Sequence, residues 1–371
     1  MKIKVCHFTS VHPWDDIRIY QKMCVSLAKN ENFEVFLIAP NADEGKHNGV
    51  NVINVEKESD DRLYRFYKLR KKVYLKALAL NADIYHFHDP ELIPYGLKLQ
   101  KKGKKVIFDS HEDVPNDILD KEWINPNLLR KLISSFYNLY EKNTTIKLSG
   151  VISVLDQITN KFKNKNLLTI HNYPKIEEFE SNVESKISLP EKFNVVYNGG
   201  LTKIRGIDVM IDAMKYLDDE YRLILMGNWE SAEYEKMCKS SEGWEKVIYL
   251  GNIPTKECFN LLQQCQLGII LFKAIPNHIN SLPNKSFEFI AAKIPILMSD
   301  FDFWKDEFKQ YANFTSPDKP DEVAENIKKI KSNYLKEIEK VNVHSPKILT
   351  EKNWKAEAEK LVKFYHKIYK S

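Results

Sequence analysis

The sequence lacks several features that would assign it to other classes of protein. Its five cysteines are odd in number and form no Cys-x-x-Cys pair, so neither a disulfide framework nor a zinc site is indicated. No apolar run reaches membrane-spanning length, and the first residues alternate Lys with apolar side chains without the core of a signal peptide. We therefore expect a cytoplasmic location.

Other absences narrow the function. The first apolar run is not followed by Gly-x-Gly-x-x-Gly, which argues against a nicotinamide-dependent dehydrogenase. The net charge of +5 is small, and nucleic-acid binding would need that excess to be concentrated, so we expect no nucleic-acid partner. No internal repeat of solenoid period is visible.

Apolar runs alternate with helical stretches along the whole chain. This pattern is typical of parallel α/β architecture, and 371 residues with 43% apolar content suit two domains of ordinary size. We predict two Rossmann-like domains that face a central cleft. The strands are expected at 3–8, 33–39, 50–55, 83–87, 105–109, 150–155 and 168–172, and then at 194–197, 221–226, 247–250, 267–271 and 295–298.

The domain boundaries follow from a change in pattern. Residues 174–191 are acidic, rich in turn residues and poor in apolar periodicity, so we interpret them as a linker. We expect an N-terminal domain at 1–175 and a C-terminal domain at 176–350. A last helix is expected at 351–371.

The most informative segment is 280–300. A loop is followed by the start of a short apolar helix, with Asn284 as its expected cap, and then by a buried strand. A helix N-terminus that faces a cleft offers unpaired N–H groups to a phosphate, which places Lys285 and Ser286 beside it. Glu288 lies one turn further on, where its carboxylate can accept a hydrogen bond from a sugar hydroxyl. A capped helix with one surface Glu would look the same in sequence.

A second segment, 195–208, has the pattern strand, glycines, basic loop, helix. Gly199 and Gly200 let the backbone approach a diphosphate closely, and the Arg205 guanidinium could pair with it through two parallel hydrogen bonds. A tight turn with a solvated Arg is the simpler alternative.

These two segments resemble the nucleotide-sugar site of glycosyltransferase family 4, whose members are retaining enzymes with a GT-B fold. The family signature is a pair of glutamates, and here Glu288 matches the second while Asn280 stands at the first. Arg205 and Gly206 match a basic element of the family, but Gly200 stands where the family has another Arg. The resemblance implies donor-binding roles for these positions, and it implies that Asn280 brings no charge to the donor sugar.

In the first half, two expected strands end in clusters of imidazoles and carboxylates, at 86–91 and 109–113. Ligand sites of doubly wound sheets gather at the carboxyl ends of strands, so both clusters should face the cleft. The clusters resemble a bacterial subgroup of family 4 associated with surface polysaccharide assembly. In that resemblance His111 faces the donor sugar and the acceptor, while His88, Asp89 and Glu112 are acceptor-side candidates.

The loop after the first strand contains Asp16 and Arg18. They could hold acceptor hydroxyls, or they could be a capping Asp and an internal ion pair. We expect no metal ion, because the histidines lack fixed zinc spacing and the Asp-x-Asp at Asp300 and Asp302 is a match expected by chance. No cofactor is expected beyond the nucleoside-diphosphate sugar as substrate.

Two basic helical stretches, 60–76 and 127–147, carry Leu, Phe and Tyr at helical spacing. They could lie on the anionic inner leaflet of a membrane, which would suit a lipid-linked acceptor. Alternatively they pack an apolar stripe on the sheet and hold their basic residues in water. We expect the second arrangement.

The resemblance implies a retaining glycosyltransferase that moves a sugar, from a UDP-sugar by first expectation, to a glycan or lipid-linked acceptor. It also implies that 1–175 is the acceptor domain, that 176–350 is the nucleotide-sugar domain, and that the helix at 351–371 packs back on the first domain. His111, Arg205 and Asn280 are the candidate catalytic positions. Two alternatives stay open, a GT-B nucleotide-sugar epimerase and a catalytically silent sugar-nucleotide binding partner.

Overall fold

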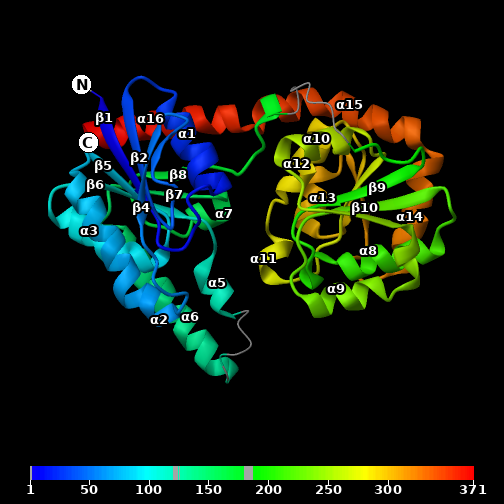
Figure 1. Ribbon diagram of the computed structural model, residues 1–371, viewed down its shortest axis with the longest axis horizontal. Helices are drawn as coiled ribbons and strands as arrows, with labels where there is room; N and C mark the ends of the chain where they lie inside the picture. Colours follow the sequence, from blue (N-terminus) through cyan, green and yellow to red (C-terminus); the bar gives the residue numbers. More distant parts are fainter. Residues whose placement is uncertain (1, 120–123, 125, 179–186) are drawn as a thin grey trace. The chain divides into compact units, whose positions relative to one another are not determined.

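The computed structural model describes residues 2–119, 124, 126–178 and 187–371, and it divides into two compact units (Figure 1). The first unit comprises residues 1–172 together with 354–371, and the second comprises 173–353. Part of the expected linker at 174–191 lies outside the described residues.

The first unit is built on a sheet in the order β3-β4-β2-β1-β5-β6-β7-β8. The pairs are parallel except for β3 against β4. The strands are β1 (Ile3–Phe8), β2 (Phe33–Pro40), β3 (Gly45–His47), β4 (Val50–Val55), β5 (Ile84–Phe87), β6 (Lys105–Ser110), β7 (Gly150–Ser153) and β8 (Leu167–Thr169). The helical segments are η1 (Ile17–Cys24), α1 (Val25–Ala28), α2 (Arg62–Tyr64), η2 (Arg65–Leu69), α3 (Arg70–Leu80), η3 (Pro90–Leu92), α4 (Ile93–Lys101), α5 (Val114–Leu119), α6 (Asn127–Thr145), α7 (Asp156–Thr159) and α16 (Trp354–Lys370).

The strands of this sheet are apolar on both faces because both faces are covered. Val5 and Ile84 pack with η1 and α16 on one face, whereas Cys6 and Tyr85 pack with α3 and α4 on the other. The last helix of the chain, α16, is thus part of the first unit and buries Leu361 completely (Figure 1).

The second unit has the sheet order β11-β10-β9-β12-β13-β14, all parallel. Its strands are β9 (Phe193–Asn198), β10 (Tyr221–Met226), β11 (Val247–Gly251), β12 (Leu267–Ile270), β13 (Ile296–Ser299) and β14 (Ala312–Thr315). Its helical segments are η4 (Ile176–Glu178), η5 (Lys203–Arg205), α8 (Ile207–Ala213), η6 (Met214–Tyr216), α9 (Ala232–Lys239), η7 (Glu242–Lys246), α10 (Thr255–Gln263), α11 (Pro276–Ile279), α12 (Asn284–Ala291), α13 (Asp302–Phe308), α14 (Pro320–Ser332) and α15 (Tyr334–Glu351). The prediction of two Rossmann-like α/β domains is confirmed, since numbering these strands from β9 gives the order 3-2-1-4-5-6.

The helix α6 departs from expectation. We expected its apolar stripe to pack on the sheet, but Leu128, Leu132, Phe136 and Leu139 are exposed. The buried line of the helix is polar instead, and Ser134 on that line donates a hydrogen bond of 2.7 Å from Oγ to the backbone of α5. The expectation is met by Tyr140, which packs on the core of the first unit, but it is wrong for these four residues, because α6 packs on α5 through its polar face. Among the described residues, no helix combines the length and apolarity needed to cross a membrane.

The docking of α16 should contribute measurably to the stability of the first unit. Leu361→Ala removes a fully buried side chain and should lower the free energy of unfolding of that unit by about 2–5 kcal/mol. Leu335→Ala is a matched control, because Leu335 on α15 is 84% exposed. Calorimetry should show a lower melting temperature for the first variant alone. Equal melting temperatures would mean that α16 is not docked.

Candidate functional site

In the second unit, the strand order reverses between β9 and β12, and ligands of such sheets bind at this switch point beyond the carboxyl ends of the strands. The chain leaves β9 through Gly199, whose φ of 142° lies in a region that other residues rarely adopt. A Cβ atom on Gly199 would lie 3.1 Å from Tyr197 Oη, 3.3 Å from Arg205 Nη1 and 3.3 Å from Lys285 Cε. The glycine turn, a guanidinium and an ammonium therefore meet at the end of β9.

Arg205 reaches this place because the turn before α8 is fixed. Gly206 has φ 68°, and a Cβ atom there would lie 2.1 Å from the carbonyl oxygen of Leu271, just after β12. Any other residue at position 206 would clash with the backbone that follows β12, so only glycine fits here. Arg205 Nη1 lies 3.4 Å from the carbonyl oxygen of Gly200, and the guanidinium lies 5.8 Å from the centre of the Phe272 ring.

Three polar atoms around this turn are buried and have no hydrogen-bond partner among the described residues: Asn198 Oδ1, Thr202 Oγ1 and Trp229 Nε1. Trp229 belongs to this place because its backbone forms a bridge with Leu201. Buried polar groups are normally paired, so these atoms mark a place where a bound molecule or water would complete the bonding.

The helix α12 begins one residue earlier than expected. Pro283 is its N-cap and makes no side-chain capping bond, so Asn284 is the first helical residue and is exposed. The prediction of an Asn284 cap is therefore wrong. Ser286 is fully buried, and its hydroxyl donates to the Pro283 carbonyl at 2.8 Å. That hydroxyl fixes the helix start.

Lys285 and Glu288 pair with each other on the first turn of α12. Lys285 Nζ lies 3.1 Å from Glu288 Oε2, which also accepts a hydrogen bond of 2.8 Å from Asn198 Nδ2. Burial acts to lower the Lys285 pKa, but the Glu288 carboxylate outweighs it and raises that pKa. Glu288 therefore holds the charged Lys285 against the end of β9. Asn280, which stands at the position of the first family glutamate, ends α11 and is exposed.

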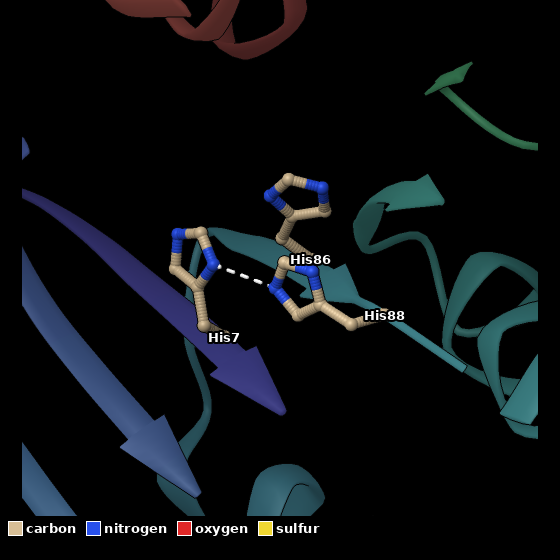
Figure 2. A group of neighbouring side chains, drawn as sticks. All are labelled: His7, His86 and His88. Carbon is tan, nitrogen blue, oxygen red and sulfur yellow. Dashed lines mark hydrogen bonds between the residues drawn. The ribbon is translucent and has the colours of Figure 1, made fainter. Parts of the chain in front are cut away.

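In the first unit, a layer of histidines lies on the sheet face covered by α16. His7 of β1 is in register with His86 of β5, and His88 follows two residues later on the same face. All three are buried. Figure 2 shows the three rings, with the bond of 2.9 Å from His7 Nδ1 to His88 Nε2 dashed.

The histidines belong to a longer hydrogen-bonded chain. His7 Nε2 lies 3.0 Å from the hydroxyl of Tyr365 on α16, and the same hydroxyl lies 2.6 Å from His86 Nδ1. At the other end, His88 Nδ1 lies 3.2 Å from Asp109 Oδ2. The chain thus runs from the carboxylate of β6 to the last helix.

One protonation pattern satisfies every link, because the carboxylate accepts only. His88 then carries its proton on Nδ1, so its Nε2 accepts from His7 Nδ1–H. His7 Nε2 in turn accepts from the Tyr365 hydroxyl, whose oxygen accepts from His86 Nδ1–H. The chain ends at His86 Nε2, which is buried without a partner among the described residues. All three imidazoles are neutral in this pattern.

Asp109 joins the histidine chain to His111. Its carboxylate is fully buried and receives two hydrogen bonds from Arg18, at 3.0 Å and 2.8 Å. His111 Nε2 lies 2.8 Å from Asp109 Oδ2 and is 15% exposed. Burial acts to raise the Asp109 pKa, but Arg18 and His111 outweigh it and hold that pKa well below its ordinary value. His111 therefore donates Nε2–H to Asp109 and presents Nδ1 for another partner.

The other sequence candidates of this unit are mostly internal. Asp16 caps η1 by accepting from the backbone of Arg18 and Ile19, both at 2.8 Å. Burial acts to raise the pKa of Asp16, but the neighbouring His12 and the backbone hydrogen bond from Ile19 lower it to about 2. Of the two readings for Asp16 and Arg18, the structure has the capping Asp and the internal ion pair. That ion pair joins Arg18 to Asp109.

Asp89 is also buried and accepts from the hydroxyl of Thr9 at 2.9 Å and from the backbone of Ser10 at 2.5 Å. His12 reaches both acidic residues, with Nε2 3.5 Å from Asp89 Oδ1 and Nδ1 3.6 Å from Asp16 Oδ2. Glu112 is exposed, next to His111. The groups of this cluster that reach the surface are thus His12, Asp16, His111 and Glu112.

Two sets of side chains could hold a metal ion by their chemistry: His7 with His86 and His88, and His88 with Asp109 and His111. In each set the ligand atoms lie within 4.8 Å of one another. Hydrogen bonding accounts for the first set, because neutral imidazoles and the Tyr365 hydroxyl supply a donor and an acceptor for its close contacts. In the second set, His88 Nδ1–H and His111 Nε2–H both donate to Asp109, so these two nitrogens, 3.2 Å apart, meet as two donors. In the second set, Arg18 already neutralises the carboxylate.

Six residues of these clusters were not among the site residues predicted from the sequence: His7, His12, Asn198, Thr202, Trp229 and Tyr365. His7 and Asn198 carried a signal, since each is a polar residue in the last two positions of a mostly apolar strand that ends at the expected site. Tyr365 carried none, because it is one of several aromatic residues in an amphipathic helix.

The fold identifies the class of the molecule. Its two Rossmann-like units match solved structures of the GT-B class over nearly the whole chain. Sucrose-phosphate synthase from Thermosynechococcus elongatus matches with a TM-score of 0.76 and 13% identity, over 99% of both chains. Anabaena HepE in complex with UDP-glucose matches with a TM-score of 0.70 and 15% identity, over 98% of this chain and 100% of that chain. A glycosyltransferase from Rickettsia africae matches with a TM-score of 0.71 and 13% identity, over 100% and 99%.

Residues 179–344 match the family model described as "Glycosyl transferases group 1". The GT-B fold of this chain therefore contains a glycosyl transferases group 1 domain, and that domain includes the glycine turn, Arg205 and α12. No curated protein sequence matches the chain.

The histidine layer should make the first unit sensitive to acid. Burial holds the pKa values of His7 and His86 well below 6.5 and lowers that of His88 to about 4. The unfolded chain therefore binds more protons below pH 6.5, so the free energy of unfolding should fall as pH drops from about 6.5 towards 4. Each pKa unit corresponds to about 1.4 kcal/mol.

Thermal unfolding across this pH interval would check the effect. His86→Asn keeps a donor for Tyr365 and should make the fall less steep, whereas His47→Gln should not, because His47 is partly exposed. A pH dependence that is the same in the wild type and in His86→Asn would contradict the burial of neutral imidazoles.

Proposed function

We propose that the protein transfers a sugar from a nucleoside-diphosphate sugar, a UDP-sugar in the first instance, to a glycan or lipid-linked acceptor in surface polysaccharide or glycolipid synthesis, with retention of configuration. The observation that carries the proposal is the meeting of Gly199, Arg205 and Lys285 at the switch point of the second sheet. Two cations beside a bare backbone turn fit a diphosphate. The UDP-glucose complex of Anabaena HepE supports the choice of nucleotide.

The chemistry assigned to the second unit is stabilisation of the leaving group. When the bond between the anomeric carbon and the diphosphate breaks, negative charge grows on the diphosphate oxygens. Arg205 and Lys285 are held in place beforehand, by the Gly206 turn and by Glu288, so they can stabilise that charge without reorganising. The unpaired Asn198, Thr202 and Trp229 atoms are candidates for polar contacts with the donor.

The chemistry assigned to the first unit is orientation of the sugar or the acceptor by His111. Its Nε2–H is bound to Asp109, so Nδ1 is free to accept a hydrogen bond from a hydroxyl. His111 has no nucleophilic role in this scheme, in which the acceptor attacks the face that the diphosphate leaves.

A lipid-linked acceptor would bring the protein from the cytoplasm to the inner face of a membrane. A product assay tests the function directly. Purified protein is incubated with UDP-glucose and related donors, with and without lipid extracts, and a glycosidic product is expected. Free diphosphate or an epimerised donor without a product linkage would favour an epimerase. Donor binding without turnover under every condition would favour a silent partner.

Arg205 should act chiefly in the transition state. Arg205→Ala should lower kcat on the order of a hundredfold and raise the donor KM less, because the guanidinium contact strengthens as charge builds on the leaving group. Arg205→Lys should recover only part of the lost kcat, since an ammonium cannot form two parallel hydrogen bonds. Arg222→Ala is the matched control, because Arg222 bonds only the carbonyls of Asp219 and Tyr221 among the described residues. If both Arg205 variants keep the wild-type kcat, Arg205 is a solvated turn residue without a role in the transition state.

Activity should survive treatment with a chelator, because Arg205 and Lys285 supply the positive charge that a metal ion supplies in other transferases. Turnover is measured after EDTA treatment and again after addition of Mg²⁺ or Mn²⁺. Loss of activity in EDTA with recovery in either metal would refute metal independence and direct attention to the His88, Asp109 and His111 set.

A further inference from the structure

The exposed face of α6 is apolar along most of its length. Leu128, Leu132, Phe136 and Leu139 follow at helical spacing and are 67%, 60%, 74% and 60% exposed. An apolar face of this kind normally packs on a core, yet here the buried residues of the helix are the polar Ser134, Glu141 and Thr145, and Tyr140 is the large side chain that packs on the core. Because large exposed apolar patches mark interaction sites, the reversed orientation calls for a partner.

A second apolar strip lies on the neighbouring segment of the same unit. Leu63 and Tyr67, on α2 and η2, are 65% and 71% exposed. The two segments are neighbours, because Arg70 at the start of α3 acts electrostatically on Tyr140 of α6, and Tyr64 packs on the same core as Tyr140 (Figure 1). We call the exposed side chains of residues 62–76 and 128–142 the α2–α6 surface.

The charge of these helices is strongly one-sided. Residues 62–80 and 127–145 contain ten Lys and Arg but only one acidic residue, Glu141. The ten are Arg62, Arg65, Lys68, Arg70, Lys71, Lys72, Lys76, Arg130, Lys131 and Lys142. Glu141 is buried, and burial raises its pKa to about 7, so it adds little negative charge. Since the whole chain has a net charge of only +5, the remainder is net negative.

Several of these cations are available to a partner. Arg65 and Lys72 are paired with Glu91 and Glu58. Lys68, Lys71 and Lys131 are exposed and form no ion pair with any described residue. They lie beside the exposed leucines and aromatics in the sequence.

We propose that the α2–α6 surface docks on an anionic phospholipid bilayer. Its leucines and aromatics enter the boundary between headgroups and acyl chains, and its lysines remain at the level of the phosphates. A second copy of the chain that presents the same surface fits poorly, because two like-charged surfaces would meet. The inference rests on the surface and not on the proposed sugar transfer, so the two can fail independently.

The test is sedimentation with vesicles of phosphatidylcholine alone and of phosphatidylcholine mixed with phosphatidylglycerol. The wild type should bind the mixed vesicles, bind the neutral ones far less, and lose binding as salt is raised. Leu132→Ser with Phe136→Ser should weaken binding to the mixed vesicles about tenfold or more, since two apolar insertions are lost. Lys68→Glu with Lys131→Glu should also weaken it more than about tenfold.

Matched control variants distinguish binding through this surface from non-specific binding to vesicles. Leu335→Ser with Val343→Ser changes two apolar residues of α15 that are 84% and 66% exposed, and Lys328→Glu with Lys329→Glu changes two exposed lysines of α14. Both control variants should bind as the wild type does. Because all the changed side chains are exposed, melting temperatures should be unchanged, and a variant that melts early is replaced by Phe136→Ser alone.

Three results would overturn the proposal. The first is equal binding of the wild type and the Leu132→Ser/Phe136→Ser variant to mixed vesicles. The second is wild-type binding to neutral vesicles as strong as to mixed ones. The third is self-association of the wild type without lipid, measured by sedimentation velocity, that disappears in the same variant, because a second copy would then cover the stripe.

Discussion

The buried carboxylate of Asp109 is the constraint around which the first unit is arranged. A charge with no exposed surface is tolerable only when it is paired and hydrogen-bonded on every side. Arg18 meets this need from η1 through two nitrogens, and its third nitrogen bonds the carbonyl of Ile170 beyond β8 at 2.7 Å. One ion pair therefore ties together a helix, a central strand and the end of the sheet. It also leaves His111 with one ring nitrogen fixed and the other presented outward.

The second unit also holds charged side chains in place, but not by burying them. Here the cations lie at the surface of a turn and are positioned by glycine geometry and by a single carboxylate. Glu288 pairs with Lys285 and Asn198, so it organises the site from behind even where it touches no ligand. The family-like glutamate thus has a structural reason for its position, whatever it contacts in a complex. The polar residues of the first unit thus form a deeply buried network, whereas those of the second unit surround a cationic turn.

Sequence patterns predicted much of this fold because buried parallel strands are short, continuous apolar runs. The bounds of β1, β4 and β10 are those expected, and most other strands differ by one or two residues. β3 was missed because Gly45–His47 is a short edge strand with no apolar residue, and β14 because Ala312–Thr315 is short and only partly apolar. The prediction of which face of α6 is buried was wrong for another reason. An apolar stripe has the same pattern whether a core or an external partner covers it.

The candidate site was predictable only in outline. The carboxyl ends of neighbouring strands meet at one edge of the sheet, so the sequence could predict that His88, Asp89 and His111 gather in one cluster. Partnerships were not predictable, because Arg18 and Asp109 are 91 positions apart and nothing local distinguishes a buried Arg from a solvated one. The pairing of Tyr365 with His7 spans 358 positions and depends on where the last helix docks.

That last pairing has a consequence for how the chain is made. The histidine layer belongs to strands near the start of the chain, but the hydroxyl that satisfies two of its rings comes from Tyr365. On the ribosome, the whole second unit emerges before that tyrosine does. The second unit can therefore be folded while the first still holds two imidazoles, His7 and His86, without their final partner. This reverses the usual order in which N-terminal domains finish first. Completion of the earliest strands waits for the last helix to be synthesised.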